Sequence, residues 1–114
     1  MNTPAVQMIT PKDALDAVTA QKAVLVDVRE REELEESGLA EPARWIATSE
    51  VEDNTPEWKA FVTQLPKDKQ IILYCKAGGR SNHVAMKLAQ MGFKTANMGG
   101  FEGWAKAGFS VKKL

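Results

Sequence analysis

Two short apolar runs restrict the possible folds of this chain more than any other feature. Residues 24–28 read Val-Leu-Val-Asp-Val, and residues 71–74 read Ile-Ile-Leu-Tyr. A strand with one face in solvent alternates apolar and polar residues, whereas a strand covered on both faces of a parallel sheet is apolar at nearly every position. Helical patterns lie between these runs. The sequence therefore predicts an α/β domain with a mainly parallel sheet between two layers of helices.

The remaining elements follow from local patterns. Strands are expected at residues 7–9, 24–28, 44–47, 71–74 and 95–98, which makes a sheet of about five strands. Thr10-Pro11 and Thr55-Pro56 each place a capping threonine before a proline, which is typical of a helix start. Further helices are expected over the acidic run 30–36, which Gly38 ends, from Ser81 as the capping residue to Gly92, and from Phe101 to Gly108.

Length, charge and cysteine content exclude several classes of protein. The 114 residues suit a single domain over 1–114, and no run approaches the ~18 apolar residues of a membrane span. Fifteen basic and fifteen acidic side chains balance, which disfavours a nucleic-acid binder with a basic face. A single cysteine forms no internal disulfide, and the first residues do not resemble a signal peptide. We therefore expect a cytoplasmic protein that is a monomer or a weak dimer.

The segment from Tyr74 to Ser81 is the most informative about function. Cys75 follows an apolar strand directly, and ligand sites in open parallel sheets form at the carboxyl ends of strands. The loop behind this cysteine consists of Lys76, Ala77, Gly78, Gly79 and Arg80. Its two cations, its inward-turning glycine amides and the positive end of the next helix all favour an anion. Cys75 is therefore expected to have a lowered pKa and to be a thiolate, which is the nucleophilic form.

A buried structural cysteine is the alternative interpretation, since free cysteine is among the most buried residue types. That interpretation does not explain why two glycines, an arginine and a new helix follow Cys75 directly. The same loop also suits an anionic substrate, because the guanidinium of Arg80 offers a rigid fork of donors to oxyanions.

Three segments of the chain resemble the rhodanese-homology (sulfurtransferase) family. Cys75, Gly78, Arg80 and Ser81 match a Cys-x-x-Gly-x-Arg-Ser pattern that recurs in single-domain members, in which six residues form the active loop. Asp27-Val28-Arg29 with Glu33 resembles the family's segment after its second strand, and residues 99–111 resemble its C-terminal Gly-Gly…Trp…Gly…Val segment. Residues 38–43 depart from the usual Gly-His-Ile-x-Gly-Ala, which leaves the pocket wall and the choice of partner open.

The resemblance implies a three-layer α/β/α rhodanese-like domain and a ping-pong sulfur transfer. Cys75 would take the outer sulfur of a small anionic donor such as thiosulfate and become a persulfide. Cyanide in an assay, or a thiol or protein cysteine in the cell, would then accept the sulfur. Residues 76–80 would hold the donor and the persulfide. The resemblance implies no metal or other cofactor, and we expect neither a nucleic-acid nor a membrane partner.

Four further residues are candidates for supporting the site. Asp27 and Arg29 come at the carboxyl end of a strand, where the resemblance implies structural hydrogen bonds and ion pairs. Trp45 is expected near the same rim, either as a pocket wall or as core. Ser81 follows the loop directly.

Two other functions stay open. A non-enzymatic persulfide carrier or interaction module of a sulfur relay would use the same loop. A cysteine-based phosphatase or arsenate reductase would carry arginine six positions after the cysteine. Here Ser81 occupies that position and the arginine comes one residue earlier, which suits a single sulfur atom better than a phosphoryl group.

Overall fold

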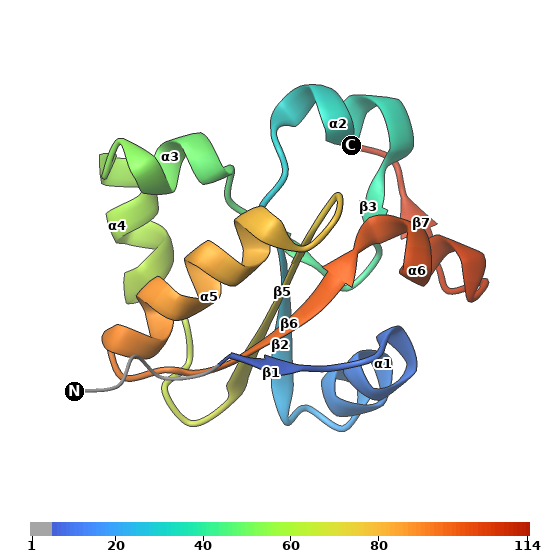
Figure 1. Ribbon diagram of the computed structural model, residues 1–114, viewed down its shortest axis with the longest axis horizontal. Helices are drawn as coiled ribbons and strands as arrows, with labels where there is room; N and C mark the ends of the chain where they lie inside the picture. The colour runs from blue at the N-terminus through green and yellow to red at the C-terminus, as the bar shows by residue number, and fades with distance from the viewer. Residues whose placement is uncertain (1–5) are drawn as a thin grey trace.

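The computed structural model describes residues 6–114, over which strands and helices alternate (Figure 1). The strands are β1 (Gln7–Met8), β2 (Ala23–Asp27), β3 (Leu39–Ala40), β4 (Arg44–Trp45), β5 (Gln70–Cys75), β6 (Lys94–Gly100) and β7 (Val111–Lys112). The helices are α1 (Pro11–Thr19), α2 (Arg31–Ser37), α3 (Thr48–Glu52), α4 (Pro56–Thr63), α5 (Gly79–Gln90) and α6 (Phe101–Lys106). Within this part of the chain, none of the helices is both long and apolar enough to cross a membrane.

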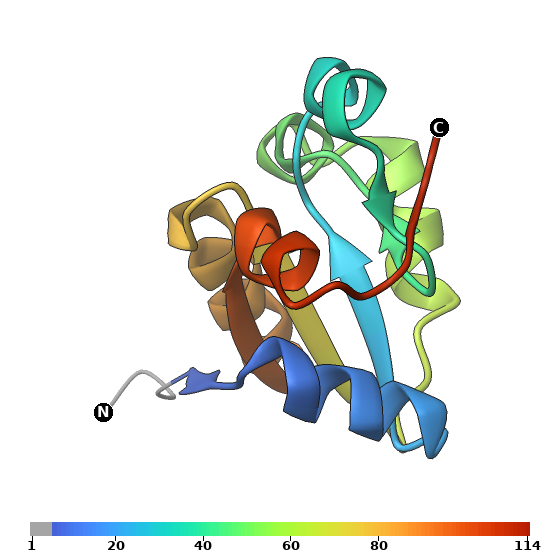
Figure 2. The same ribbon diagram turned by 90° about the vertical axis from the view of Figure 1, so that its right-hand side faces the viewer.

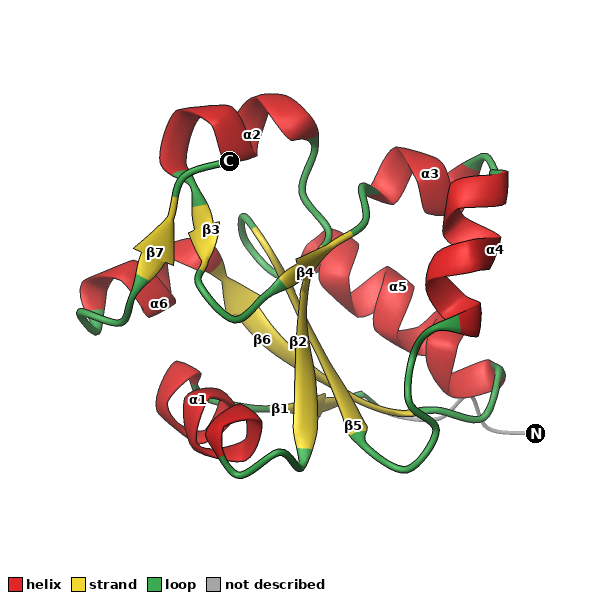
Figure 3. Cartoon of the chain, turned by 180° about the vertical axis from the view of Figure 1, so that it is seen from behind, coloured by secondary structure: helices red, strands yellow, loops and turns green. Residues whose placement is uncertain are grey.

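The central sheet has five strands in the order β1-β6-β5-β2-β4, and every neighbouring pair is parallel. This confirms the predicted parallel sheet of about five strands. The two apolar runs lie side by side at its centre, with Val26 opposite Leu73 (Figure 3). Because both faces of these strands are covered, β2 is buried along its whole length.

Alternate side chains of the central strands enter two separate cores. One core lies beneath α3, α4 and α5 and includes Val26, Leu73 and Trp58 of α4. The other lies beneath α1 and α6 and includes Leu25 and Trp104 of α6. Figures 1 and 2 show these two groups of helices on opposite faces of the sheet, which is the predicted three-layer arrangement.

The expected helix starts are confirmed at two threonines. The hydroxyl of Thr10 accepts a hydrogen bond from the amide of Asp13 at 3.1 Å, and that of Thr55 accepts one from the amide of Trp58 at 3.2 Å. In each case a proline occupies the first turn, where its missing N–H leaves no partner unsatisfied. Gly38 follows α2 with φ +75°, as expected of a glycine after a helix.

The structure corrects the expected start of the helix after the active loop. Ser81 does not cap it, because α5 begins two residues earlier at Gly79 and Gly78 is the capping residue. Gly78 has φ +102°, a conformation that glycine adopts without strain, so the loop turns sooner than a serine cap would allow. Ser81 is thereby fully buried in the first turn of α5.

Three further details differ from the sequence prediction. The strand expected at residues 95–98 continues through Gly99 and Gly100 as part of β6, and α3 was not expected. Residues 38–43, which lack the family's usual segment, contribute β3. This strand pairs antiparallel with β7, with Leu39 opposite Lys112. A two-residue strand whose partner lies near the other end of the chain has too few residues to show a pattern.

Candidate active site

Cys75 is the last residue of β5 and lies beneath the loop that leads into α5. The residue is 1% exposed. Its neighbour in the sheet is Gly100, and a Cβ atom at that position would collide with the carbonyl oxygen of Lys76. A glycine at position 100 is therefore required by the close approach of two backbones, directly beside the cysteine.

Hydrogen-bond donors converge on the sulfur of Cys75. The amide of Gly78 donates to Sγ at 3.0 Å, and the hydroxyl of Ser81 lies 3.4 Å from it. Burial acts to raise the pKa of the Cys75 thiol, but hydrogen bonds from the Ser81 side chain and from the amides of Ser81, Gly78 and Ala77 outweigh it. The pKa of Cys75 is therefore lowered below its ordinary value.

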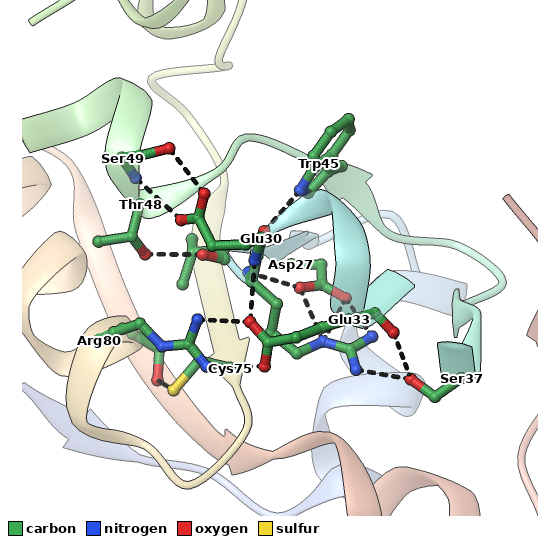
Figure 4. A network of polar contacts seen from close by, with 12 residues as sticks. Asp27, Glu30, Glu33, Ser37, Trp45, Thr48, Ser49, Cys75 and Arg80 are labelled. Atoms are coloured by element: carbon green, nitrogen blue, oxygen red, sulfur yellow. Dashed lines mark hydrogen bonds and ion pairs between the residues drawn. The ribbon is translucent and has the colours of Figure 1, made fainter. Parts of the chain in front are cut away.

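Arg80 does not point freely into the loop. Its two terminal nitrogens donate to the two carboxylate oxygens of Glu33 in α2, at 2.6 and 2.9 Å (Figure 4). Glu33 also accepts a hydrogen bond from the amide of Glu30 at the start of α2. The second cation of the loop is thus largely neutralised, and the pair ties the active loop to α2.

The same pair gives a prediction about pH. Hydrogen bonds from Arg80 lower the pKa of Glu33 from 4.5 to about 2, against the effect of burial. A carboxyl whose pKa is lower in the folded state stabilises the fold above its unfolded pKa, and this contribution is lost as the pH falls from about 4.5 towards 2. Because the Glu33 side chain is 28% exposed, we expect Glu33→Gln to lower the free energy of unfolding by about 1–2 kcal/mol near neutrality.

Urea unfolding of Glu33→Gln and the wild type, compared near neutrality and at about pH 2.5, measures this effect. The difference between the two proteins should shrink at the lower pH. Glu32 is the neighbouring, exposed carboxyl, so Glu32→Gln serves as the control and should stay within ~0.5 kcal/mol of the wild type. A Glu33→Gln deficit that persisted unchanged in acid would contradict the assignment.

Asp27 and Arg29 form a buried ion pair at the end of β2. Their side chains are 0% and 4% exposed, and Nη2 of Arg29 donates to Oδ2 of Asp27 at 2.8 Å. The same guanidinium donates to the hydroxyl of Ser37 at 2.8 Å and to the carbonyl of Gly38 at 2.6 Å. Arg29 therefore connects β2 to the end of α2. We call Asp27, Arg29, Ser37 and Gly38 the frame of the site.

Trp45 lies beside this frame and is half-buried. Its indole N–H donates to the carbonyl of Arg29 at 2.8 Å, and its ring borders a hollow of about 440 Å³ with several carboxylates. A second hollow, of about 310 Å³, opens between α2 and α6 and is lined by Lys76, Glu33 and Phe101 among others. Lys76 and Ala77 are exposed.

Two features of the site escaped the sequence analysis. Asn97 of β6 is buried at 3% exposure and contacts both Ser81 and Gly78. The sequence did contain a signal for Asn97, because its polar side chain lies between the apolar residues Ala96 and Met98 of the strand. Glu33 was noted only as part of a family segment, not as the partner of Arg80. Among residues 6–114, no three His, Cys, Asp or Glu side chains gather as they would around a metal ion.

Comparison with known proteins shows similarity to a family model, to curated relatives and to solved structures. The family model for the Rhodanese-like domain matches residues 10–107. The thiosulfate sulfurtransferase GlpE of Actinobacillus succinogenes is 31% identical over 106 residues, which cover 91% of this chain and 88% of that protein. A rhodanese-related protein from Thermoplasma volcanium has a similar crystal structure, with a TM-score of 0.73 and 27% identity over 93% of this chain and 97% of that one.

A further solved structure bears on the alternatives. It is a protein of unknown function from Rhodopseudomonas palustris that is described as a "Possible Tyrosine Phosphatase". The TM-score is 0.75 and the identity 27%, over 94% of this chain and 85% of that one. Proteins with different described activities therefore share this fold, and the chemistry has to be argued from the loop.

Proposed function

The chain belongs to the rhodanese-like domain family, and from that premise we propose that it transfers sulfane sulfur from thiosulfate or a similar anionic donor to a thiophilic acceptor through Cys75. The family and the GlpE relative support a sulfurtransferase in general. The observation that carries the finer proposal is the convergence of the Gly78 amide and the Ser81 hydroxyl on Sγ of Cys75. These donors favour the thiolate that the first step requires.

In the first step the Cys75 thiolate attacks the outer sulfur of thiosulfate. A bond forms between Sγ and that sulfur, the sulfur–sulfur bond of thiosulfate breaks, and sulfite leaves with the electron pair. Cys75 then carries a persulfide whose outer sulfur is anionic. Sulfite leaves readily as an anion, so the step needs no general acid. We expect the amides of the loop, of which that of Gly78 already reaches Sγ, to supply donors for the new charge.

In the second step a thiolate or cyanide attacks the outer sulfur of the persulfide. The persulfide bond breaks, its electron pair returns to Sγ, and the Cys75 thiolate is regenerated. With cyanide the product is thiocyanate, and with a cellular thiol it is a new persulfide. No net oxidation occurs over the cycle, because one sulfane sulfur moves from donor to acceptor.

Burial and charge define the donor that suits the site. Since Cys75 is 1% exposed, the site suits a small donor whose reacting atom lies at its end, such as the outer sulfur of thiosulfate. Lys76 is exposed beside the cysteine and attracts an anion. Arg80 is held by Glu33, so we assign it mainly to the shape of the loop, with a direct contact to the donor as a secondary role.

Intact mass after incubation with thiosulfate tests the proposal. We expect a gain of one sulfur atom, about 32 Da, that dithiothreitol removes, because a thiol reduces the persulfide and releases the sulfur. A wild-type protein whose mass stays unchanged with thiosulfate would contradict thiosulfate as donor. If the same protein gains the sulfur from a cysteine desulfurase, the persulfide-carrier alternative is favoured.

A phosphatase is the second candidate, because of the Rhodopseudomonas palustris neighbour. The pairing of Arg80 argues against it, since both terminal nitrogens of the guanidinium are bound to Glu33 and not available to clamp a phosphoryl group. Hydrolysis of an aryl phosphate in the absence of any sulfur transfer would reverse this preference.

A further inference from the structure

Asn97 is a buried polar residue for which the sulfur-transfer scheme gives no role. It lies in β6 between Ala96 and Met98, which pack into the core beneath α1 and α6. Asn97 is 3% exposed and directs its amide to the other face of the sheet, where the active loop lies. Its side-chain nitrogen donates to the carbonyl of Gly78 at 3.0 Å.

The orientation of this amide is fixed by its partners. The oxygen of Asn97 accepts hydrogen bonds from the amide of Gly99 at 2.9 Å and from the hydroxyl of Ser81 at 2.8 Å. A backbone N–H only donates and a carbonyl only accepts, so the oxygen must face Gly99 and the nitrogen must face Gly78. No other uncharged side chain of this size offers a donor and an acceptor in this way.

Gly78 is the residue that Asn97 holds, and Gly78 is also the residue whose N–H reaches the sulfur. Its φ is +102°, but glycine can adopt many other φ values. The residue type alone therefore does not fix the direction of that N–H. The Gly78 carbonyl accepts a hydrogen bond from the side chain of Asn97 and another from the backbone N–H of Asn82 in α5. Two donors from different elements thus fix the residue.

Ser81 has one hydroxyl proton for two acceptors, Oδ1 of Asn97 and Sγ of Cys75. When the hydroxyl turns towards a thiolate, Oδ1 of Asn97 keeps the hydrogen bond from Gly99. No buried acceptor is then left without a donor, so the turn costs little. The contact between Asn97 and Ser81 competes for this proton and so disfavours the Cys75 thiolate. The contact between Asn97 and Gly78 has the opposite effect, because it favours the thiolate.

We propose that Asn97 is a positioning residue of the active site, which holds the Gly78 amide on the sulfur of Cys75 and so stabilises its thiolate. The inference rests on Cys75 as the nucleophile and deepens the proposed function. It gives β6, the strand next to β5 in the sheet, a part in the reactivity of Cys75.

The decisive experiment measures the pKa of Cys75 from the pH dependence of its alkylation by iodoacetamide. Ser81→Ala serves as the background, because it removes the competition for the hydroxyl proton. Adding Asn97→Ala should raise the pKa of Cys75 by about one unit, which makes alkylation about tenfold slower at pH values below that pKa. Arg80, Glu33 and Lys76, the charged groups around the cysteine, are the same in both proteins.

Met98→Ala is the matched control, since Met98 is the next residue of β6 and packs on the opposite face. It should lower the stability of the same strand and leave the pKa of Cys75 unchanged. A purely structural Asn97 would behave like this control, and an unchanged pKa in the folded Ser81→Ala, Asn97→Ala protein overturns the proposal. If that protein does not fold, Asn97→Leu, which fills the space, takes its place with the same criterion.

Alkylation separates this inference from the proposed function. Iodoacetamide reports on the thiolate of Cys75 whether or not the protein transfers sulfur. A raised pKa in a protein that gains no sulfur from thiosulfate would support the positioning role and refute the donor. If the wild type gains sulfur from thiosulfate but the pKa of Cys75 is unchanged by loss of Asn97, the donor is supported and the positioning role is refuted.

Discussion

Replacement of Cys75 by serine should abolish sulfur transfer and leave the fold intact. The chain contains one cysteine, so no other thiol can take over the attack. A serine hydroxyl in the same place is almost entirely protonated near neutrality and is a far weaker nucleophile towards sulfur. We expect the rate of thiocyanate formation from thiosulfate and cyanide to fall by at least about 10³-fold.

The fold should tolerate this change because serine is smaller than cysteine and accepts the same hydrogen bond from Gly78. We expect the free energy of unfolding to stay within about 1 kcal/mol of the wild type. Asn82→Ala, an exposed change in the first turns of α5, is the activity control and should retain the wild-type rate. Substantial turnover by a folded Cys75→Ser protein would refute Cys75 as the nucleophile.

The fold was predictable because its strongest signals are local. The apolar runs of β2 and β5 are long enough to identify strands covered on both faces, and they lie adjacent at the centre of the sheet. Thr10 and Thr55 identify helix starts through contacts with amides three residues ahead. Each of these signals can be recognised within one element of the sequence.

The site was predictable only as far as its contacts are local. Cys75 at the end of a strand with glycines behind it is a pattern within one segment. The pairing of Arg80 with Glu33 joins residues 47 positions apart, and it depends on where α2 lies over the loop. From the sequence both loop cations were therefore expected to attract an anion, whereas in the structure one of them, Arg80, is engaged with Glu33.

Ser81 shows how one local rule can be overridden by another. A serine before an apolar helical pattern is a good cap, and this predicted a helix start at Ser81. The left-handed conformation of Gly78 starts the helix earlier and turns the serine towards Cys75 and Asn97. The side chain that was expected to satisfy the helix end is therefore a donor in the active site.

The largest effect on stability is expected from Arg29→Met. This change leaves the carboxylate of Asp27, whose side chain is 0% exposed, buried without its cation. Removing one partner of a buried ion pair typically costs about 3–5 kcal/mol, because the remaining charge is neither solvated nor paired. The change also removes the guanidinium carbon that lies 4.3 Å from the ring centroid of Phe101, so loss of this cation–π contact adds to the cost.

Two further proteins separate the lost charge from other causes. In Asp27→Asn, Arg29→Met both charges are absent, and much of the stability should return, since an uncharged buried pair avoids the desolvation of an isolated ion. Arg31→Met breaks the pair between Arg31 and Glu35, whose side chains are 64% and 55% exposed. That change should cost less than about 1 kcal/mol, because solvent screens exposed ion pairs.

Denaturant unfolding of the four proteins at one pH gives the comparison, with the midpoint and slope both fitted. Arg29 also donates to Ser37 and Gly38 at the end of α2, so its loss should loosen the helix that carries Glu33. We therefore expect Glu33→Gln to cost less stability in the Arg29→Met background than in the wild type. If the free energy of unfolding of Arg29→Met lies within about 1 kcal/mol of that of the wild type, the buried pair does not hold the frame of the site together.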